Sequence, residues 1–297
     1  MTAPDEILCI GSVLWDIIGR STASMRAGSD VPGHITRHPG GVALNVAMTL
    51  RRFGMHPILL SAVGEDEEGR DLIAVTNRMG LITDHIYRSP DLPTDRYMAI
   101  EAANGLIAAI ADAHSLEAAG DKILGPLSDG RLGSTAAPYS GAIALDGNLT
   151  EALLAEIAQS PAFAKANLCV APASPGKAER LLPLLGLPNA TFYVNLEEAR
   201  LLCQTRFDDA PMGAKALLDR GAARVLVTNG RDTAAYAGPE GILTAAPPQV
   251  HVTRVTGAGD TFMAAHIAAD VKGADAKTAL TEALRAAADY VSGDVPL

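Results

Sequence analysis

Patterns typical of buried strands and of helices take turns along most of this chain. Short apolar runs bounded by Gly, Pro or polar residues predict strands buried on both faces, and the longer amphipathic stretches between them predict helices. Strands that alternate with helices are joined by right-handed crossovers, which predicts a mainly parallel sheet covered by helices. The predicted strands are 7–10, 57–62, 142–145, 168–171, 191–194 and 225–228, and the predicted helices are 41–53, 66–79, 149–157, 212–220 and one that begins near Asp260.

One region interrupts this alternation. Two apolar-rich runs, 96–101 and 106–111, flank Asn104-Gly105, and Asn-Gly between such runs is a strong hairpin signal. The polar, Gly- and Pro-bearing residues 21–38 predict irregular structure or an edge strand. We therefore expect a small β-sheet lid, inserted at about 12–38 and 88–114 into a single α/β domain that spans 1–297.

Composition narrows the class of protein. The chain has 297 residues, 48% of them apolar but only 4% aromatic, which favours helices of Ala and Leu packed on a parallel sheet. Net charge is 24 − 34 = −10, which argues against a nucleic acid or an anionic membrane as the main partner. Three widely spaced cysteines, no signal-peptide pattern and no long apolar run predict a cytoplasmic protein.

Several polar residues follow predicted strands. Asp16 comes shortly after the first strand, Asp146 and Asn195 end later strands, and Asn229-Gly230 follows another. Ligands bind at the carboxyl ends of strands in parallel α/β sheets. We expect the binding site to lie at this edge.

The stretch VTGAGDTFMAAHIAA (255–269) carries the most specific chemistry. Gly257, Ala258 and Gly259 precede Asp260 at the start of an apolar helix. Small residues let a ligand approach the free amides of the first helical turn, which makes an anion site. Thr256 or Asp260 could instead simply cap the helix. A carboxylate beside a phosphate site is unfavourable in charge unless it takes part in the reaction. Transfer of a phosphoryl group to an alcohol gives it such a role, because the carboxylate accepts the proton of the alcohol.

TGAGDTF resembles the C-terminal signature of the PfkB/ribokinase family of ATP-dependent sugar and nucleoside kinases. The resemblance runs from about residue 7 to 290. It implies a ribokinase-like three-layer α/β/α sandwich with a mainly parallel sheet and a β-sheet lid. Four further motifs resemble the family's in the same order: GSVLWD (11–16), PGGVALN (39–45), VGEDEEG (63–69) and NLEE (195–198).

The resemblance also implies roles for individual residues. Asp260 would be the general base, beside an anion hole formed by the amides of Gly257, Ala258 and Gly259. Asn195 and Glu198 would organise Mg²⁺ through water, although their spacing also suits a helix capping pair. The residues expected to bind the substrate are Asp16, Gly41, Asn45, Asp146 and Asn148, and those expected to bind ATP are Asn195, Glu198, Thr228, Gly230 and Thr256.

The chain departs from the family pattern in two places. Arg254 stands where the family usually has an Asp that helps to bind a monovalent cation. We expect that cation site to be absent or altered, with the Arg254 guanidinium either close by or in solvent. Thr233 replaces the last Gly of the V-T-x-G-x-x-G run, so the nucleotide loop should differ in shape.

The branch of the family suggests a substrate. Asp146-Gly-Asn148 and the 172–177 run that ends in Lys177 resemble the pseudouridine-kinase-like branch. This favours phosphorylation of a primary hydroxyl on a nucleoside. Free ribose, fructose or a sugar acid remain alternatives, as does a non-catalytic sensor on the same fold. A nicotinamide-binding Rossmann enzyme is disfavoured because no G-x-G-x-x-G follows the first strand.

Further expectations concern the lid and three side chains. The lid should close over the substrate, and its exposed edges predict a homodimer that pairs through the lid. We expect His266 to be a packed core residue. Trp15 should pack at the end of a strand, with stacking on a base or sugar as the alternative, and Lys177 should be a solvated helix residue, with an approach to the substrate or nucleotide as the alternative.

Overall fold

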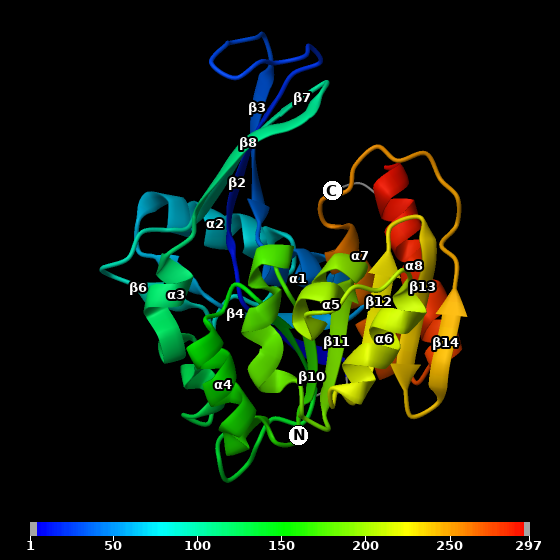
Figure 1. Ribbon diagram of the computed structural model, residues 1–297. Helices are drawn as coiled ribbons and strands as arrows, with labels where there is room; N and C mark the ends of the chain where they lie inside the picture. Colours follow the sequence, from blue (N-terminus) through cyan, green and yellow to red (C-terminus); the bar gives the residue numbers. More distant parts are fainter. Residues whose placement is uncertain (1–4, 294–297) are drawn as a thin grey trace.

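The computed structural model describes residues 5–293 and is built around one eight-stranded sheet (Figure 1). The strand order is β14-β13-β12-β11-β10-β9-β1-β4, and the six strands from β12 to β4 are parallel. β13 and β14 complete one edge as an antiparallel hairpin. The strands are β1 (Glu6–Ile10), β4 (His56–Leu60), β9 (Ala142–Asp146), β10 (Asn167–Ala171), β11 (Ala190–Asn195), β12 (Arg224–Asn229), β13 (Asp232–Gly238) and β14 (Gly241–Ala245).

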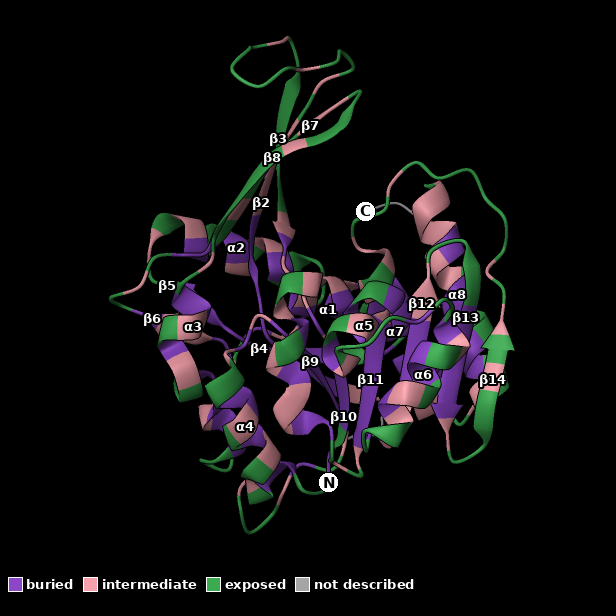
Figure 2. Ribbon diagram, viewed as in Figure 1, coloured by how far each residue is buried: buried purple, intermediate pink, exposed green. Residues whose placement is uncertain are grey.

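Helices cover both faces of this sheet and give the molecule two cores. Successive residues of β1 point to opposite sides, so Leu8 and Ile10 pack in one core while Ile7 and Cys9 pack in the other. Figure 2 shows the buried strands between the helical layers. One layer holds α1 (Val42–Arg52), α2 (Glu67–Arg78), α7 (Ala258–Val271) and α8 (Ala276–Ser292). The other holds α3 (Ser115–Ala119), η1 (Gly120–Leu127), α4 (Glu151–Gln159), η2 (Pro161–Phe163), η3 (Pro175–Leu184), α5 (Leu196–Cys203) and α6 (Ala210–Asp219).

A second sheet of four strands, which we call the lid, projects from the carboxyl ends of the main sheet (Figure 1). Its order is β3-β2-β7-β8, with β2 parallel to β7 and the other pairs antiparallel. Two short strands, β5 (Ala62–Gly64) and β6 (Tyr87–Ser89), pair near its base. The lid strands are β2 (Leu14–Arg20), β3 (His34–Gly40), β7 (Arg96–Ala102) and β8 (Gly105–Asp112).

The expected α/β fold is confirmed, with differences at particular elements. The hairpin at Asn104-Gly105 forms as expected, and the 21–38 segment contains the edge strand β3. The sequence patterns missed β2, the β13–β14 hairpin and α8. β13 reads Asp-Thr-Ala-Ala-Tyr-Ala-Gly and shows little alternation of apolar and polar residues. α8 does carry a helical apolar pattern, since Ala279, Leu280, Ala283 and Leu284 are buried on one face, and the sequence analysis did not use it. No helix in the described part of the chain has the length and apolar character needed to cross a membrane.

Candidate active site

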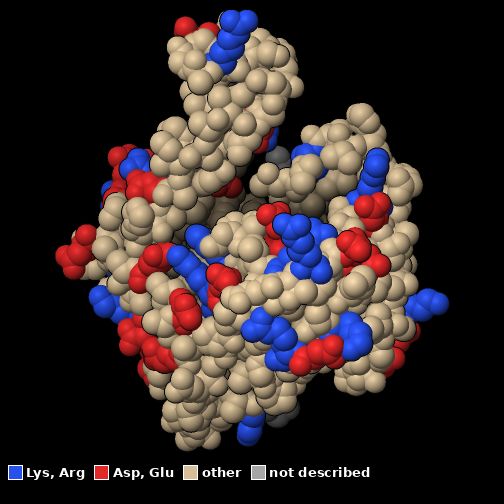
Figure 3. Space-filling view, in the orientation of Figure 1, with Lys and Arg blue, Asp and Glu red and all other residues tan. Residues whose placement is uncertain are grey.

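The expected site residues gather where the lid meets the carboxyl ends of the strands, below the hollow visible in Figure 3. Asp146 ends β9, Asn195 ends β11 beside Thr228 of β12, and Asp16 lies near the base of the lid in β2. α7 brings Asp260 to the same edge, because α7 begins there and runs back along the sheet (Figure 1). The parallel topology therefore places residues from distant parts of the chain together.

Asp260 lies in the first turn of α7 and is half-buried. Its Oδ2 accepts a hydrogen bond of 2.8 Å from Nδ2 of Asn45, which projects from the first turns of α1. Burial raises the pKa of Asp260 to about 7; the Asn45 hydrogen bond opposes this, and the Asp146 and Asp16 charges add to it. A carboxylate with a pKa near neutrality suits proton transfer at physiological pH.

The amides of the first turn of α7 lie next to this carboxylate. Gly257 is the N-cap, with a left-handed φ of 88° that favours glycine. Gly259 is exposed, and a Cβ there would meet nothing within 4 Å, so a ligand has room to approach the backbone. Within residues 5–293 the amides of Gly257, Gly259 and Asp260 have no acceptor, whereas Ala258 donates its N–H to the Val255 carbonyl at 3.0 Å. The expectation of a free Ala258 amide is therefore wrong for this structure.

Asp16 presents an unpaired carboxylate to the cleft. No group within residues 5–293 donates a hydrogen bond to it, and desolvation raises its pKa to about 6. A Cβ on Gly40, in the neighbouring strand, would overlap this carboxylate. Gly41, with φ of 100°, then lets α1 begin close to the Ser12 carbonyl. The two consecutive glycines thus leave Asp16 open to a ligand.

Asp146 differs because protein groups already surround its carboxylate. Oδ2 accepts the backbone N–H of Ser12 at 2.7 Å, the Ser12 hydroxyl at 2.9 Å and the amide of Ala43 at 3.2 Å. Oδ1 accepts the amide of Asn148 at 2.8 Å. Burial raises the pKa of Asp146 while these hydrogen bonds act to lower it. Asp146 therefore ties the loop after β1 to α1 and β9 instead of presenting free oxygens to a ligand.

Asn148 extends this network to a lysine. Its Nδ2 donates to the Ser12 hydroxyl at 2.9 Å, and its Oδ1 accepts from Nζ of Lys177 at 2.6 Å. Lys177 is half-buried, and desolvation lowers its pKa. The expectation of a solvated lysine is wrong. Sequence reasoning also missed Ser12, although its position in the GSVLWD motif directly after β1 was a usable signal.

Asn195 and Glu198 form a capping box at the start of α5. The Asn195 amide donates to Glu198 Oε2 at 2.8 Å, and the Glu198 amide donates to Asn195 Oδ1 at 2.9 Å. Desolvation raises the pKa of Glu198 to about 7, and the Glu197 and Asp260 charges act in the same direction. Thr228 pairs with Asn195 across the strands, and Gly230 follows with φ of 57°.

The side-chain oxygens of Asn195 and Glu198 suit a hydrated magnesium ion better than a dehydrated one. Glu198 Oε1 receives no hydrogen bond from the described residues, so it is open to a water molecule of a hydrated cation. Within residues 5–293 no cluster of three or more His, Cys, Asp or Glu side chains is arranged to hold a metal.

Arg254 lies near the site but points to the end of α8. Its Nε donates to the Tyr290 carbonyl at 2.8 Å, and its guanidinium stacks 4.0 Å from the centre of the Tyr290 ring. Of the two expected positions for this guanidinium, the one close to the anion-hole loop is observed.

His266 and Trp15 have packing roles. His266 is buried, and its Nδ1 lies 2.9 Å from the Tyr193 hydroxyl; desolvation lowers its pKa to about 4. This confirms a packed histidine. Trp15 is buried at the start of β2, which confirms packing at the end of a strand. It donates its indole N–H to the Glu68 carbonyl and carries the Arg37 guanidinium 3.8 Å above its ring.

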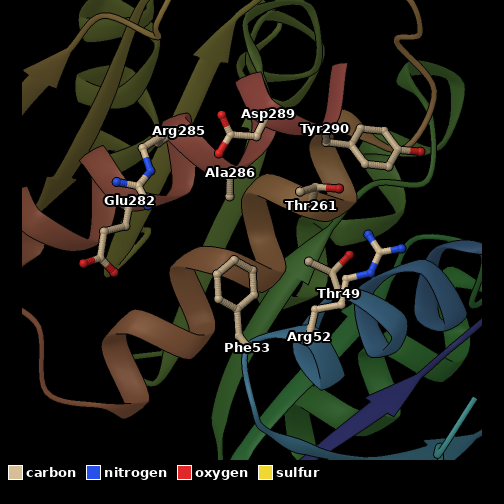
Figure 4. Close-up of a pocket in the computed structure, with 9 residues that line it drawn as sticks. All are labelled: Thr49, Arg52, Phe53, Thr261, Glu282, Arg285, Ala286, Asp289 and Tyr290. Atoms are coloured by element: carbon tan, nitrogen blue, oxygen red, sulfur yellow. The ribbon is translucent and has the colours of Figure 1, made fainter. Parts of the chain in front are cut away.

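A separate pocket of about 330 Å³ lies between α1, α7 and α8 (Figure 4). It contains none of the expected site residues, although Thr261 directly follows Asp260. Its lining is Thr49, Arg52, Phe53, Thr261, Glu282, Arg285, Ala286, Asp289 and Tyr290.

Known proteins resemble this chain over nearly its whole length. The family model for pfkB family carbohydrate kinases matches residues 4–292. The chain is 30% identical to the pseudouridine kinase of Escherichia coli over 269 residues, which cover 89% of this chain and 83% of the relative. A carbohydrate kinase from Agrobacterium tumefaciens superposes with a TM-score of 0.80 at 25% identity, over 96% of this chain and 90% of that one.

A second solved structure shows the same fold at lower identity. It is the ribokinase of Arabidopsis thaliana complexed with ribose and ATP, with a TM-score of 0.77 at 19% identity, over 100% of this chain and 94% of that one. The fold, the order of the motifs and the family match agree. The chain belongs to the pfkB family of carbohydrate kinases.

Proposed function

We propose that this kinase transfers the γ-phosphoryl group of ATP to a primary hydroxyl of a ribosyl-type substrate, and that the substrate is a nucleoside such as pseudouridine. The observation that carries the proposal is the position of Asp260. Its carboxylate has a pKa raised to about 7 and stands beside the amides of Gly257, Gly259 and Asp260, which lack acceptors within residues 5–293. One group can accept a proton at the point where the others stabilise an anion.

Asp260 would act as the general base. Its carboxylate takes the proton of the substrate hydroxyl as that oxygen bonds to the transferred phosphorus and the bond to the ADP oxygen breaks. The Asn45 amide holds one Asp260 oxygen at 2.8 Å and leaves the other for the hydroxyl. The amides of Gly259 and Asp260 would stabilise charge on the transferred group.

The nucleotide would lie along the ends of β11 and β12. Thr228 and Gly230 border this edge, and Glu198 with Asn195 stands where a hydrated Mg²⁺ could be held through water. Mg²⁺ would supply charge neutralisation on the phosphates. Thr256 precedes the anion-hole glycine and would contact the same phosphates.

Asp16 would hold the ribosyl hydroxyls. An ionised carboxylate without protein donors can accept two hydroxyls, which suits the diol of a ribosyl group. The Lys177 ammonium has three N–H donors and donates one of them to Asn148. The other donors could bind an acceptor on the substrate, such as a carbonyl of the nucleobase. This donor, with the similarity to a pseudouridine kinase, favours a nucleoside over a free sugar.

Two alternative functions are a kinase for a free sugar or sugar acid and a non-catalytic sensor. A free sugar or sugar acid as acceptor would leave Lys177 to bind a hydroxyl or carboxylate. A non-catalytic sensor would have no use for a base beside an anion site, so the Asp260 arrangement speaks against it.

An ADP-release screen tests the proposal. The acceptors are pseudouridine, uridine, ribose, fructose and sugar acids, each with Mg²⁺ and ATP, and Asp260→Asn serves as the inactive control. We expect pseudouridine or another nucleoside to give the highest kcat/KM. Turnover confined to free sugars or hexose phosphates would contradict the nucleoside substrate, and no turnover with any acceptor would favour a sensor.

We also propose that the kinase is a homodimer that pairs through the lid. One lid face carries apolar residues from three strands at matching register positions: Ile35 is 80% exposed, Ile110 67%, and Met98 and Ile100 lie between them on β7. The stem of the lid shows few charges on the face seen in Figure 3. Packing two such faces together would bury them.

Sedimentation velocity checks the dimer. We expect Ile110→Glu to convert the wild-type dimer to a monomer, and Ile242→Glu, a matched change outside the lid on β14, to leave it intact. A wild-type monomer at micromolar concentration would refute this pairing.

A further inference from the structure

The C-terminal end of α8 is joined to the loop that precedes the anion-hole amides. The carbonyls in the last turn of a helix lack partners within the helix, and the helix dipole makes this end negative. Here the loop supplies the partners. The backbone amides of Thr253 and Arg254 donate to the Val291 carbonyl at 2.8 and 3.3 Å, and the Thr253 hydroxyl donates to it at 3.1 Å.

Arg254 adds a positive charge to the same junction. Its Nε donates to the Tyr290 carbonyl at 2.8 Å, and its guanidinium carbon lies over the Tyr290 ring, 4.0 Å from the ring centre. Arginine suits this position because it stays charged, is planar and stacks on aromatic faces, whereas lysine offers a compact ammonium without a stacking plane. Arg254 therefore fixes both the backbone and the ring of Tyr290.

Tyr290 in turn reaches the anion-hole loop. Its hydroxyl donates to the Thr256 carbonyl at 3.0 Å. A Cβ on Gly257 would lie 2.6 Å from that hydroxyl, so the loop backbone packs directly on it. Gly257 is the N-cap of α7, and within residues 5–293 its own amide and those of Gly259 and Asp260 have no acceptor. The chain of contacts runs from Arg254 through Tyr290 to Thr256 and Gly257.

We propose that Arg254 is a positioning residue, whose guanidinium, held by the C-terminal end of α8, fixes Tyr290 and through it the orientation of the anion-hole amides. The inference rests on the proposed function for its kinetic consequence, but the ordering of the loop does not depend on the substrate. The transferred group must meet preformed amides, and a displacement of about 1 Å in such a site can cost about 100-fold in rate. Arg254 itself touches no reacting atom.

The test compares Arg254→Met, which keeps an unbranched apolar stem and removes the guanidinium with its charge, with Arg285→Met, which removes an exposed arginine from the surface of α8. We expect Arg254→Met to lower kcat by about 10- to 100-fold while KM for the acceptor stays within about twofold. Arg254→Lys should recover only part of the loss because it cannot stack. Arg285→Met should match the wild type.

Hydrogen exchange gives a readout that needs no substrate. In the ligand-free protein, Arg254→Met should speed deuterium uptake at 255–261 and leave uptake in β9 unchanged. Tyr290→Phe removes only the hydroxyl and should also speed deuterium uptake at 255–261, by a smaller factor. This second variant keeps the test valid if Arg254→Met does not fold. Unchanged uptake at 255–261 in both variants, or a kcat within twofold of wild type, would overturn the proposal. A wild type without any turnover would count against the proposed function alone, because the exchange comparison would still stand.

Discussion

Asp146 and Asp260 are two buried or half-buried carboxylates at the same edge of the sheet, but they are surrounded differently. Asp146 is 2% exposed and accepts four hydrogen bonds, from Ser12 in the loop after β1, Ala43 in α1 and Asn148 in the turn after β9. Asp260 accepts one hydrogen bond, from Asn45, and its pKa rises to about 7. The first carboxylate has its oxygens satisfied by the protein, and the second retains an oxygen for a ligand.

This contrast separates a structural carboxylate from a chemical one. A buried charge with several donors stabilises the geometry around it, and Gly11 keeps the required space, since a Cβ there would overlap Asp146. A carboxylate with few donors is less stable when ionised and is therefore a better base. The family motifs alone give both residues as site residues and do not distinguish these roles.

The largest expected effect is that of Asp260→Asn on turnover. The amide keeps the shape and the contact to Asn45 but cannot accept the proton, so kcat should fall by about 10³- to 10⁴-fold. ATP affinity, measured by calorimetry, should stay within a few-fold of wild type. A kcat within tenfold of wild type would remove Asp260 from the role of base.

Asp146→Asn should reduce stability instead. The backbone N–H groups of Ser12 and Ala43 now donate to the Asp146 carboxylate. In the variant the NH₂ group of the asparagine would face these donors and could not accept from them, at a cost of about 3 kcal/mol in the free energy of unfolding. Urea unfolding at pH 8 measures this.

Asp260→Asn should have the opposite effect on stability at pH 8 and stabilise the folded protein. A carboxyl group whose folded pKa is raised favours the folded state only when protonated, so its ionisation costs stability as pH rises from about 4 to about 7. Removing the charge should therefore raise Tm by about 2–4 °C at pH 8. Similar destabilisation by both variants would erase the contrast between the two residues.

Activity should depend on pH through Asp260. The base must be ionised, so kcat/KM should reach a plateau above pH about 7 and fall about tenfold per pH unit below it. A profile at constant ionic strength from pH 5 to 9 checks the acidic limb. A limb with a midpoint near pH 4 would show that the working carboxylate has an ordinary pKa.

The smallest expected effect is that of potassium. With Arg254 bound to the end of α8, exchanging Na⁺ for K⁺ at fixed ionic strength should change turnover by less than about twofold. Strong saturable activation by K⁺ would show that a monovalent cation site remains despite the arginine.

The sequence patterns predicted most of the parallel sheet and the order of the site motifs. The buried strand residues 225–227 form an uninterrupted apolar run, and glycines at 257 and 259 mark a close approach of backbone and ligand. Patterns failed where tertiary contacts override local preference. β2 follows β1 after only three residues and leaves the main sheet for the lid, a change of direction that no local period encodes.

Individual side-chain environments were harder to predict than positions. Lys177 looked like a solvated helix residue, yet the turn after β9 brings Asn148 to within 2.6 Å of its Nζ. Asp146 was expected to bind substrate, but its donors come from Ser12 and Ala43, which are far away in the sequence. Such hydrogen-bond partners depend on how strands and helices pack, which residue spacing does not reveal.

The central claim is that Asp260 accepts the proton of the acceptor hydroxyl beside the α7 amides. A crystal structure with pseudouridine and a non-hydrolysable ATP analogue tests it most directly. We expect an Asp260 oxygen at about 2.6–3.2 Å from a primary hydroxyl of the acceptor, with the terminal phosphate on the amides of Gly259 and Asp260. A carboxylate turned away from both the acceptor and the terminal phosphate would contradict the account.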